Sequence, residues 1–141
     1  MTISLRRART IIRKTLEKGR EMDLKPLSVV VLDPGGHVQA FEREDGASPG
    51  RFAIAQGKAY GAVMLGMPGS AQMARAEAQA YFMNAVNGTF GGQVVPVPGG
   101  VLVRGKNGAV VAAVGVTGDT SDNDAAAAQA GIEAVGLTAD I

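Results

Sequence analysis

Apolar residues recur every three to four positions along residues 3–22, which is the spacing of one face of an α-helix. The apolar stripe consists of Leu5, Ala8, Ile12, Leu16 and Gly19. The opposite face is basic and carries Arg6, Arg7, Arg9, Arg13, Lys14, Lys18 and Arg20. Such a face can bind RNA or an anionic membrane, but this one lacks the aromatic residues that interfacial helices use. We therefore interpret it as the solvated face of an amphipathic helix.

Two short apolar runs follow and predict a β-hairpin. Residues 27–32 are rich in β-branched side chains, which favour a strand. The Asp-Pro-Gly-Gly sequence at 33–36 favours a tight turn, because proline sets φ at the second position and glycine accepts a positive φ at the third. Residues 38–43 then return as the second strand.

The middle of the chain is predicted to be helical. A serine suited to an N-cap, followed by a proline, predicts a helix over residues 48–67. The Pro-Gly pair at 68–69 ends this helix, and a shorter one follows over residues 70–78. The pattern of residues 80–87 fits neither a helix nor a strand clearly.

Three strands are predicted in the second half of the chain, over residues 93–97, 101–104 and 109–117. Glycine-containing turns separate them, and the Lys-Asn-Gly turn before the last strand is a strong hairpin signal. The last strand is apolar on both faces, so we expect it to lie at the centre of the sheet with both sides covered.

A final helix is predicted over residues 125–135, because Asp122 and Asp124 suit the positive end of the helix dipole. The tail at 137–141 is expected to be loose. The predicted element order is thus α-β-β-α-α-β-β-β-α in a single domain, residues 1–141. Five antiparallel strands with packed helices indicate an α+β fold. Placing the last strand beside the first gives the strand order 2-1-5-4-3, a profilin-like or PAS-like arrangement.

Composition narrows the function classes. The chain has 141 residues and a net charge of +1, so bulk electrostatic attraction to nucleic acid is not expected. It has no cysteine, which excludes disulfides, zinc–thiolate sites, iron–sulfur clusters and haem attachment through a CxxCH motif. No apolar run reaches the roughly 18 residues of a membrane span, and no signal peptide is expected. We expect a cytoplasmic protein that binds neither nucleic acid nor membrane.

His37 is the only histidine and follows the predicted turn. Its side chain is the only one with an unperturbed pKa near neutrality, so it could act as a general base or as an axial ligand of haem iron. The alternative is a histidine that simply ends a turn. With one histidine, a site with several histidine ligands for a metal is excluded within one chain.

Three charged residues complete the candidate set. Arg43 and Asp45 either form a structural ion pair at a strand end, or Arg43 binds a carboxylate through its guanidinium group. Lys58 borders the apolar stripe of the second predicted helix. It either extends its ammonium group to solvent or points into a cleft, where it would bind an anion or a haem propionate, or act as a base or nucleophile.

Backbone groups and tyrosines offer further candidates. Gly99 and Gly100 lie in a glycine-rich loop of the kind that can bind anions through backbone N–H groups, although turns and close packing also explain them. The loop lacks the features of a P-loop or a dinucleotide-binding fingerprint. Tyr60 and Tyr81 are the only tyrosines, and either could ligate haem iron, although core packing is the favoured interpretation.

Several of these segments together resemble the GlcG/HbpS-like family, also called the haem-degrading domain family. The resemblance covers nearly the whole chain and is carried by residues 29–37, 43–47, 55–59, 98–101 and 114–118, with Asp124 following. It implies the fold outlined above and a homo-oligomer, from dimer to octamer. Some members of the family bind haem. Arg51 and Glu44 depart from the family pattern and add charge at the presumed site.

Two hypotheses follow from the residues and the resemblance. The first is a small-ligand-binding protein with haem as the named cofactor, ligated by His37 or a tyrosine. The second is a small catabolic enzyme, such as a hydratase, isomerase or hydrolase, acting on an organic acid or ring-cleavage product. In that case Arg43 and Lys58 would bind a carboxylate, and His37 or Asp45 would move a proton. An accessory subunit without a ligand is a third interpretation.

Overall fold

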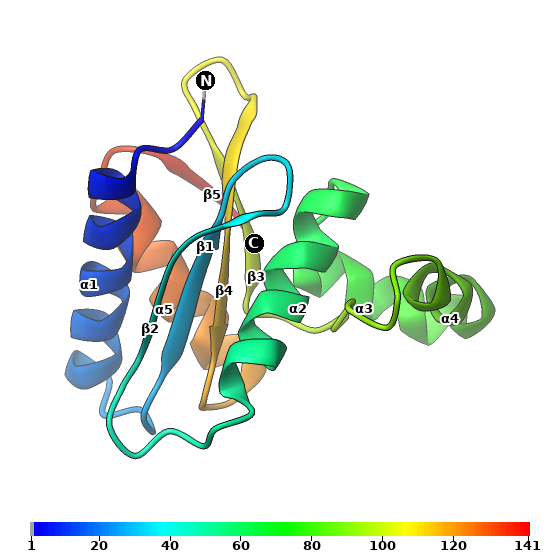
Figure 1. Ribbon diagram of the computed structural model, residues 1–141, viewed down its shortest axis with the longest axis horizontal. Coiled ribbons are helices and arrows are strands. Elements are labelled where there is room, and N and C mark those ends of the chain that lie inside the picture. Colours follow the sequence, from blue (N-terminus) through cyan, green and yellow to red (C-terminus); the bar gives the residue numbers. More distant parts are fainter. Residues whose placement is uncertain (1) are drawn as a thin grey trace.

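The computed structural model describes residues 2–141 as a five-stranded antiparallel sheet with helices on both faces (Figure 1). The helices are α1 Leu5–Glu21, α2 Arg51–Leu65, α3 Gly69–Ala78, α4 Ala80–Thr89 and α5 Ser121–Glu133. The strands are β1 Ser28–Leu32, β2 Val38–Arg43, β3 Gly100–Arg104, β4 Val110–Thr117 and β5 Thr138–Asp140. The strand order is β2-β1-β4-β3-β5. The α+β class is therefore confirmed, and the long apolar strand β4 lies at the centre beside β1.

One face of the sheet is covered by α1 and α5 (Figure 1). The apolar stripe of α1 supplies Ala8, Ile11 and Ile12, which pack with Val29 and Val31 of β1 in the larger core cluster. Ser4 caps α1, because its Oγ accepts a hydrogen bond from the Arg7 N–H. The amphipathic pattern thus predicts the helix and most of its buried face, although Leu5 is 50% exposed and Ile11, outside the predicted stripe, is buried.

Helix α2 covers the other face at very short range. A Cβ atom added at Gly115 would overlap the carbonyl oxygen of Ala55, and one added at Gly100 would overlap the carbonyl oxygen of Lys58. The helix backbone therefore rests directly on the backbones of β3 and β4. The alanines of α2 pack here with Val30 and Leu32 of β1 in a second cluster.

The edge strand beside β3 differs from the prediction. Residues 93–97, predicted as a strand, are irregular and pack on α2, where the Val95 N–H donates to the Gly57 carbonyl. Pro96 and Pro98 lack N–H groups, so this segment is poorly suited to a sheet ladder. The edge is formed instead by β5, which pairs Leu102 with Asp140 and lies in the tail that was predicted to be loose.

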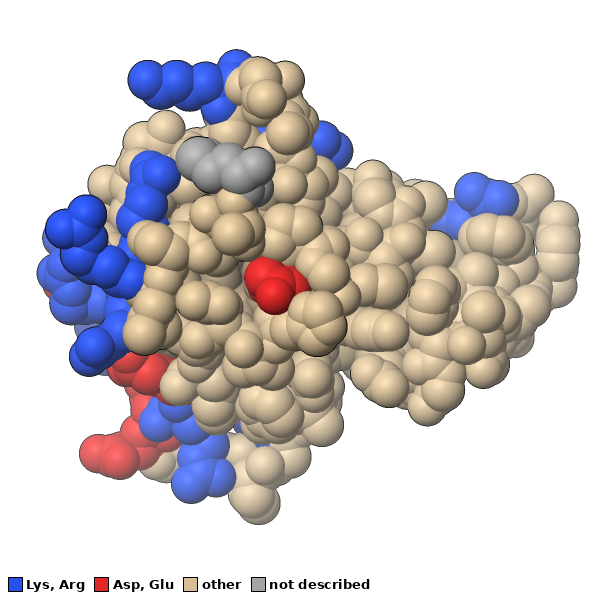
Figure 2. All heavy atoms as spheres, turned by 45° about the horizontal axis from the view of Figure 1, so that its top comes forward, with Lys and Arg blue, Asp and Glu red and all other residues tan. Residues whose placement is uncertain are grey.

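Helices α3 and α4 project from the body of the molecule as a separate arm (Figure 1). The arm shows few charged side chains on the face seen in Figure 2. Its small core consists of Met83, Val86 and Val94, while Tyr81 is 73% exposed. The ambiguous residues 80–87 are therefore helical.

Helix boundaries shift slightly from the predicted ones. α2 begins at Arg51 with Gly50 as its N-cap, and Ser48 lies just before it, with its Oγ accepting from Arg51 Nε. α5 begins at Ser121, because Thr120 caps it by accepting the Asn123 N–H. No helix within residues 2–141 combines the length and apolar character needed to cross a bilayer.

The contact of α2 with the sheet gives a direct test. Replacing Gly115 with alanine should lower the free energy of unfolding by about 1–3 kcal/mol or more, because the new methyl group has no space between two backbones. Gly88→Ala in α4 is the control: nothing lies within 4 Å of its added Cβ, so it should be neutral or stabilising by up to about 1 kcal/mol. Urea unfolding of both variants would contradict the close contact if Gly115→Ala were as stable as wild type.

Candidate functional site

The predicted site residues fall in three separate places. His37 lies at the tip of the β1–β2 hairpin, just before β2 begins. Arg43 ends β2, and Asp45 follows it, so both lie at the opposite end of that strand. Lys58 is inside the molecule, between α2 and the sheet. Among candidates distant in the sequence, the structure therefore brings together only Lys58 with Gly99 and Gly100.

At the hairpin tip, Asp33 organises the turn and the imidazole together. Its Oδ1 accepts hydrogen bonds from the backbone N–H groups of Gly35 (2.9 Å) and His37 (3.0 Å). The same oxygen lies 3.1 Å from the His37 Nδ1. The pKa of Asp33 lies below its ordinary value, chiefly because the carboxylate accepts the His37 backbone N–H. Burial opposes this shift, and the Gly35 N–H and the imidazole add to it. The carboxylate is thus ionised at neutral pH and can only accept.

This geometry determines which imidazole nitrogen is free. Because the Asp33 carboxylate only accepts, Nδ1 of His37 carries the hydrogen, and in the neutral ring Nε2 presents its lone pair. The His37 side chain is 80% exposed, so this lone pair is available to a ligand. A histidine whose second nitrogen donates to a carboxylate is the usual arrangement of a metal ligand.

The tip rests on the second half of α2. Gly36 has φ of +86°, and a Cβ atom there would lie 2.7 Å from the Met64 Cε, with Val63 and Tyr60 within 4 Å. Glycine is favoured at this point by its positive φ, whereas the nearby Met64 methyl is the end of a flexible side chain that can move. Apolar and aromatic side chains of α2 therefore lie beside Gly36, the residue that precedes His37.

Lys58 forms a buried ion pair with Asp124 of α5. Its Nζ donates to Asp124 Oδ2 at 3.1 Å and to the Val116 carbonyl at 2.9 Å, and the two side chains are 3% and 1% exposed. Burial lowers the pKa of Lys58 and raises that of Asp124, and in each case the charge of the partner opposes the shift. The ammonium group thus has two protein acceptors and does not reach a cleft.

Gly99 and Gly100 make room for this pair. A Cβ atom at Gly99 would lie 2.9 Å from Lys58 Nζ, so the bare loop backbone covers the lysine. The outer side of the same loop lines a hollow of about 270 Å³ beside α5. Close packing therefore accounts for both glycines, and anion binding by their N–H groups stays a prediction.

Arg43 and Asp45 form no ion pair with each other among residues 2–141. The acidic residue between them is the one with a structural role. Glu44 accepts the Leu27 N–H at 2.7 Å and pairs with Arg20 at 3.2 Å, so it joins the end of β2 to the start of β1 and to α1. Arg51 likewise has a structural partner, since it donates to Thr117 Oγ1.

Sequence reasoning did not assign roles to three acidic residues that organise these places, Asp33, Asp119 and Asp124. Asp33 was visible only as a turn residue, and Asp124 only as part of the family pattern and an acidic helix start. Asp119 accepts the N–H groups of Lys25 and Thr120 and the Asn123 side-chain amide, which lowers its pKa to about 2, the Asn123 bond contributing most. An Asp two residues before a helix is the local signal that could have indicated this role.

Breaking the buried pair should be costly. Lys58→Met leaves the Asp124 carboxyl group buried without its cation, and we expect the free energy of unfolding to fall by about 3–5 kcal/mol. The double variant Lys58→Met/Asp124→Asn should lose less than the sum of the two single variants, because it removes both charges. Lys106→Met, at an exposed turn, should stay within about 0.5 kcal/mol of wild type. Strictly additive losses in denaturant unfolding would contradict a coupled pair.

Asp119 should make stability depend on acid pH. Its folded-state pKa of about 2 lies below the ordinary value of 3.8, so its contribution is complete above pH 4 and disappears as the pH falls toward 2. The difference in melting temperature between wild type and Asp119→Ala should therefore shrink across this interval. A difference that stays constant down to pH 2 would contradict the proposed hydrogen bonding of the carboxylate.

Comparison with known structures finds proteins of similar fold. The structure of a PduOC:heme complex matches with a TM-score of 0.86 and 20% identity over 97% of both chains, which shows the fold. HbpS matches with a TM-score of 0.82 and 27% identity over 96% of this chain and 91% of that one. Klebsiella pneumoniae protein ORFY matches with a TM-score of 0.83 and 25% identity over 94% and 90% of the two chains.

Comparison with the curated proteins gives no significant match. The family model described as "Haem degrading protein HbpS-like" matches residues 3–133, which is nearly the whole chain. The resemblance deduced from the sequence motifs is thereby confirmed, and the chain belongs to the HbpS-like family.

Proposed function

We propose that this protein binds haem and that His37 is the axial ligand of the iron. The observation that carries the proposal is the exposed imidazole whose Nδ1–H is held by Asp33 and whose Nε2 is free. Membership of the HbpS-like family and the similarity in fold to a protein solved in complex with heme support it. Bound haem would supply an iron centre capable of redox chemistry.

The residues at the hairpin tip suit this role chemically. An imidazole nitrogen is a common ligand for haem iron, and a carboxylate on the opposite nitrogen fixes the ring orientation and increases its basicity. Tyr60, Val63 and Met64 lie next to Gly36 and offer apolar surface for one side of a flat ring system. The role of Asp33 is that of a positioning residue, since it acts through His37.

The enzymatic alternative draws less support from the arrangement of its residues. His37 and Arg43 are six positions apart along the extended strand β2, or about 20 Å at 3.3 Å per residue. Lys58 is already paired with Asp124 and buried. The enzymatic hypothesis needs His37, Arg43, Asp45 and Lys58 to act together on one small acid. That would require groups from more than one chain, and no contact among residues 2–141 favours it.

Titration of the purified protein with hemin, followed by absorbance, tests the proposal. Wild type should give a saturable Soret band, and His37→Ala should weaken binding by at least tenfold and shift the band. Asp33→Asn keeps an oxygen that can accept the turn N–H groups but removes the charge, and we expect it to weaken binding by about tenfold. Its band position should shift as well, which a purely structural defect would not cause.

Tyr60→Phe and Tyr81→Phe are the matched controls, because each removes only a hydroxyl group. Both should bind hemin as wild type does. Unchanged binding and an unchanged spectrum in His37→Ala would contradict the proposal, and loss of the band in a tyrosine variant would assign the iron ligand to that tyrosine instead.

A further inference from the structure

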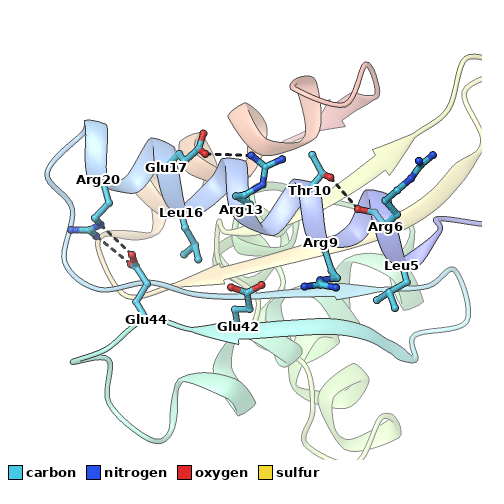
Figure 3. Close-up of a pocket in the computed structure, with 10 residues that line it drawn as sticks. All are labelled: Leu5, Arg6, Arg9, Thr10, Arg13, Leu16, Glu17, Arg20, Glu42 and Glu44. Carbon is cyan, nitrogen blue, oxygen red and sulfur yellow. Dashed lines mark hydrogen bonds and ion pairs between the residues drawn. The ribbon is translucent and has the colours of Figure 1, made fainter.

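A groove runs between helix α1 and strand β2, at the edge of the sheet (Figure 3). Its volume is about 640 Å³, and an adjoining hollow of about 440 Å³ extends it past Pro26 to Asp45. β2 pairs only with β1, so the backbone groups on its outer side are open along the groove. An open edge strand is a ready template for pairing with another strand.

Positive charge gathers at one end of this groove. Figure 3 shows Leu5 and Arg9 over one end of it, and Arg6 projects from the same turn of α1. Neither Arg6 nor Arg9 forms an ion pair with any residue between 2 and 141. Arg6, Arg9 and Arg13 are three and four residues apart, a spacing at which like charges destabilise a helix. The chain therefore keeps two unpaired cations here at a cost in stability.

Acidic side chains lie in the middle of the groove and toward its other end, where Arg20 and Arg43 are also found. Figure 3 shows Glu44 beside Arg20 at that end and Glu42 between the two ends. Glu42 is exposed on β2 and, within the described chain, has no cationic partner. Arg20 is already paired with Glu44, and Arg13 with Glu17. Unpaired charges of opposite sign, Arg6 and Arg9 on α1 and Glu42 on β2, thus occupy different positions along one groove.

This distribution of charges suits an antiparallel pair formed by β2 of two copies related by a two-fold axis. In such a pair, residues directly opposite each other point to the same face, so the two-fold axis passes between the two copies of one residue near the middle of β2, Ala40 or Phe41. With the axis at Ala40, Glu42 lies opposite Val38 of the second copy. With the axis at Phe41, Glu42 lies opposite Ala40 of the second copy. Both arrangements bring Glu42 toward the half of the groove where Arg6 and Arg9 of the other copy lie.

We propose that the groove is a self-association surface, in which β2 of two copies pair antiparallel and join the two sheets. Glu42 of each copy meets Arg9 or Arg6 of the other, so every contact occurs twice. The homo-oligomer expected from the sequence would then contain a continuous ten-stranded sheet, with the two α1 helices on the same side. A nucleic acid or an anionic membrane fits less well, because Glu42 would face its phosphate groups.

Charge reversal tests the surface with matched variants, using analytical ultracentrifugation of the full chain over a range of concentrations. Arg9→Glu and Glu42→Arg each turn two attractions into repulsions, so each should weaken self-association by about tenfold or more and increase the amount of the smaller species. The double variant Arg9→Glu/Glu42→Arg restores opposite charges and should regain the wild-type assembly. Circular dichroism confirms that each variant is folded, which is expected because both side chains lie on the surface.

Mixing the two single variants gives a second, independent readout. Arg9→Glu has two acidic groups at this edge and Glu42→Arg has two basic ones, so the two proteins should form a hetero-assembly when mixed in equal amounts. This pairing should weaken as salt is added. A monomeric wild type, single variants that assemble like wild type, or a double variant that stays dissociated would each overturn the proposal. A larger oligomer that the variants reduce to a smaller one would support it.

Discussion

The direct contact of α2 with the sheet is the constraint on which the other features depend. Gly100 and Gly115 let the helix backbone touch the strand backbones, with no side chains between them. Because α2 lies so close to the sheet, the ammonium group of Lys58 on α2 reaches both the Val116 carbonyl of β4 and the Asp124 carboxylate of α5. The same helix carries Tyr60 and Met64 to the hairpin tip. Packing of one helix thus connects the buried ion pair with the exposed histidine.

The two most distinctive ionisable groups of the chain consequently have opposite surroundings. Lys58 is out of contact with water, and its charge is balanced by a carboxylate that is equally buried. A pair of this kind tolerates the loss of neither partner, which suits a structural role better than a chemical one. His37 is exposed, and its carboxylate partner fixes one nitrogen while leaving the other free. These surroundings support the proposal that an external ligand binds at the hairpin tip.

The sequence indicated the fold well where the signal was local. Apolar spacing identified α1, and the Asp-Pro-Gly-Gly turn identified the β1–β2 hairpin, because helix and turn preferences depend on neighbouring residues. Residues 93–97 were misread as a strand, since an apolar run covered by α2 has the same pattern as a buried strand. β5 was missed because three residues without apolar alternation carry no strand signal, and its pairing with β3 comes from the tertiary structure.

The candidate site was predictable only in part. His37 stood out as the one histidine, but its pairing with the Asp33 side chain became evident only from the turn geometry. Lys58 and Asp124 are 66 residues apart, and no local pattern joins them. His37 and Arg43 lie at opposite ends of the extended strand β2. This length keeps them from sharing one small carboxylate ligand within a chain, although they are close in the sequence.

The most direct test of the account uses the single histidine. Protein labelled with ¹⁵N only in histidine would be loaded with ferric haem and studied by pulsed electron paramagnetic resonance. Every ¹⁵N signal must then come from His37, since the haem nitrogens remain ¹⁴N. The account predicts a strong ¹⁵N hyperfine coupling to the iron, typical of a directly bound imidazole. A spectrum of saturated protein with ¹⁴N couplings alone would contradict it.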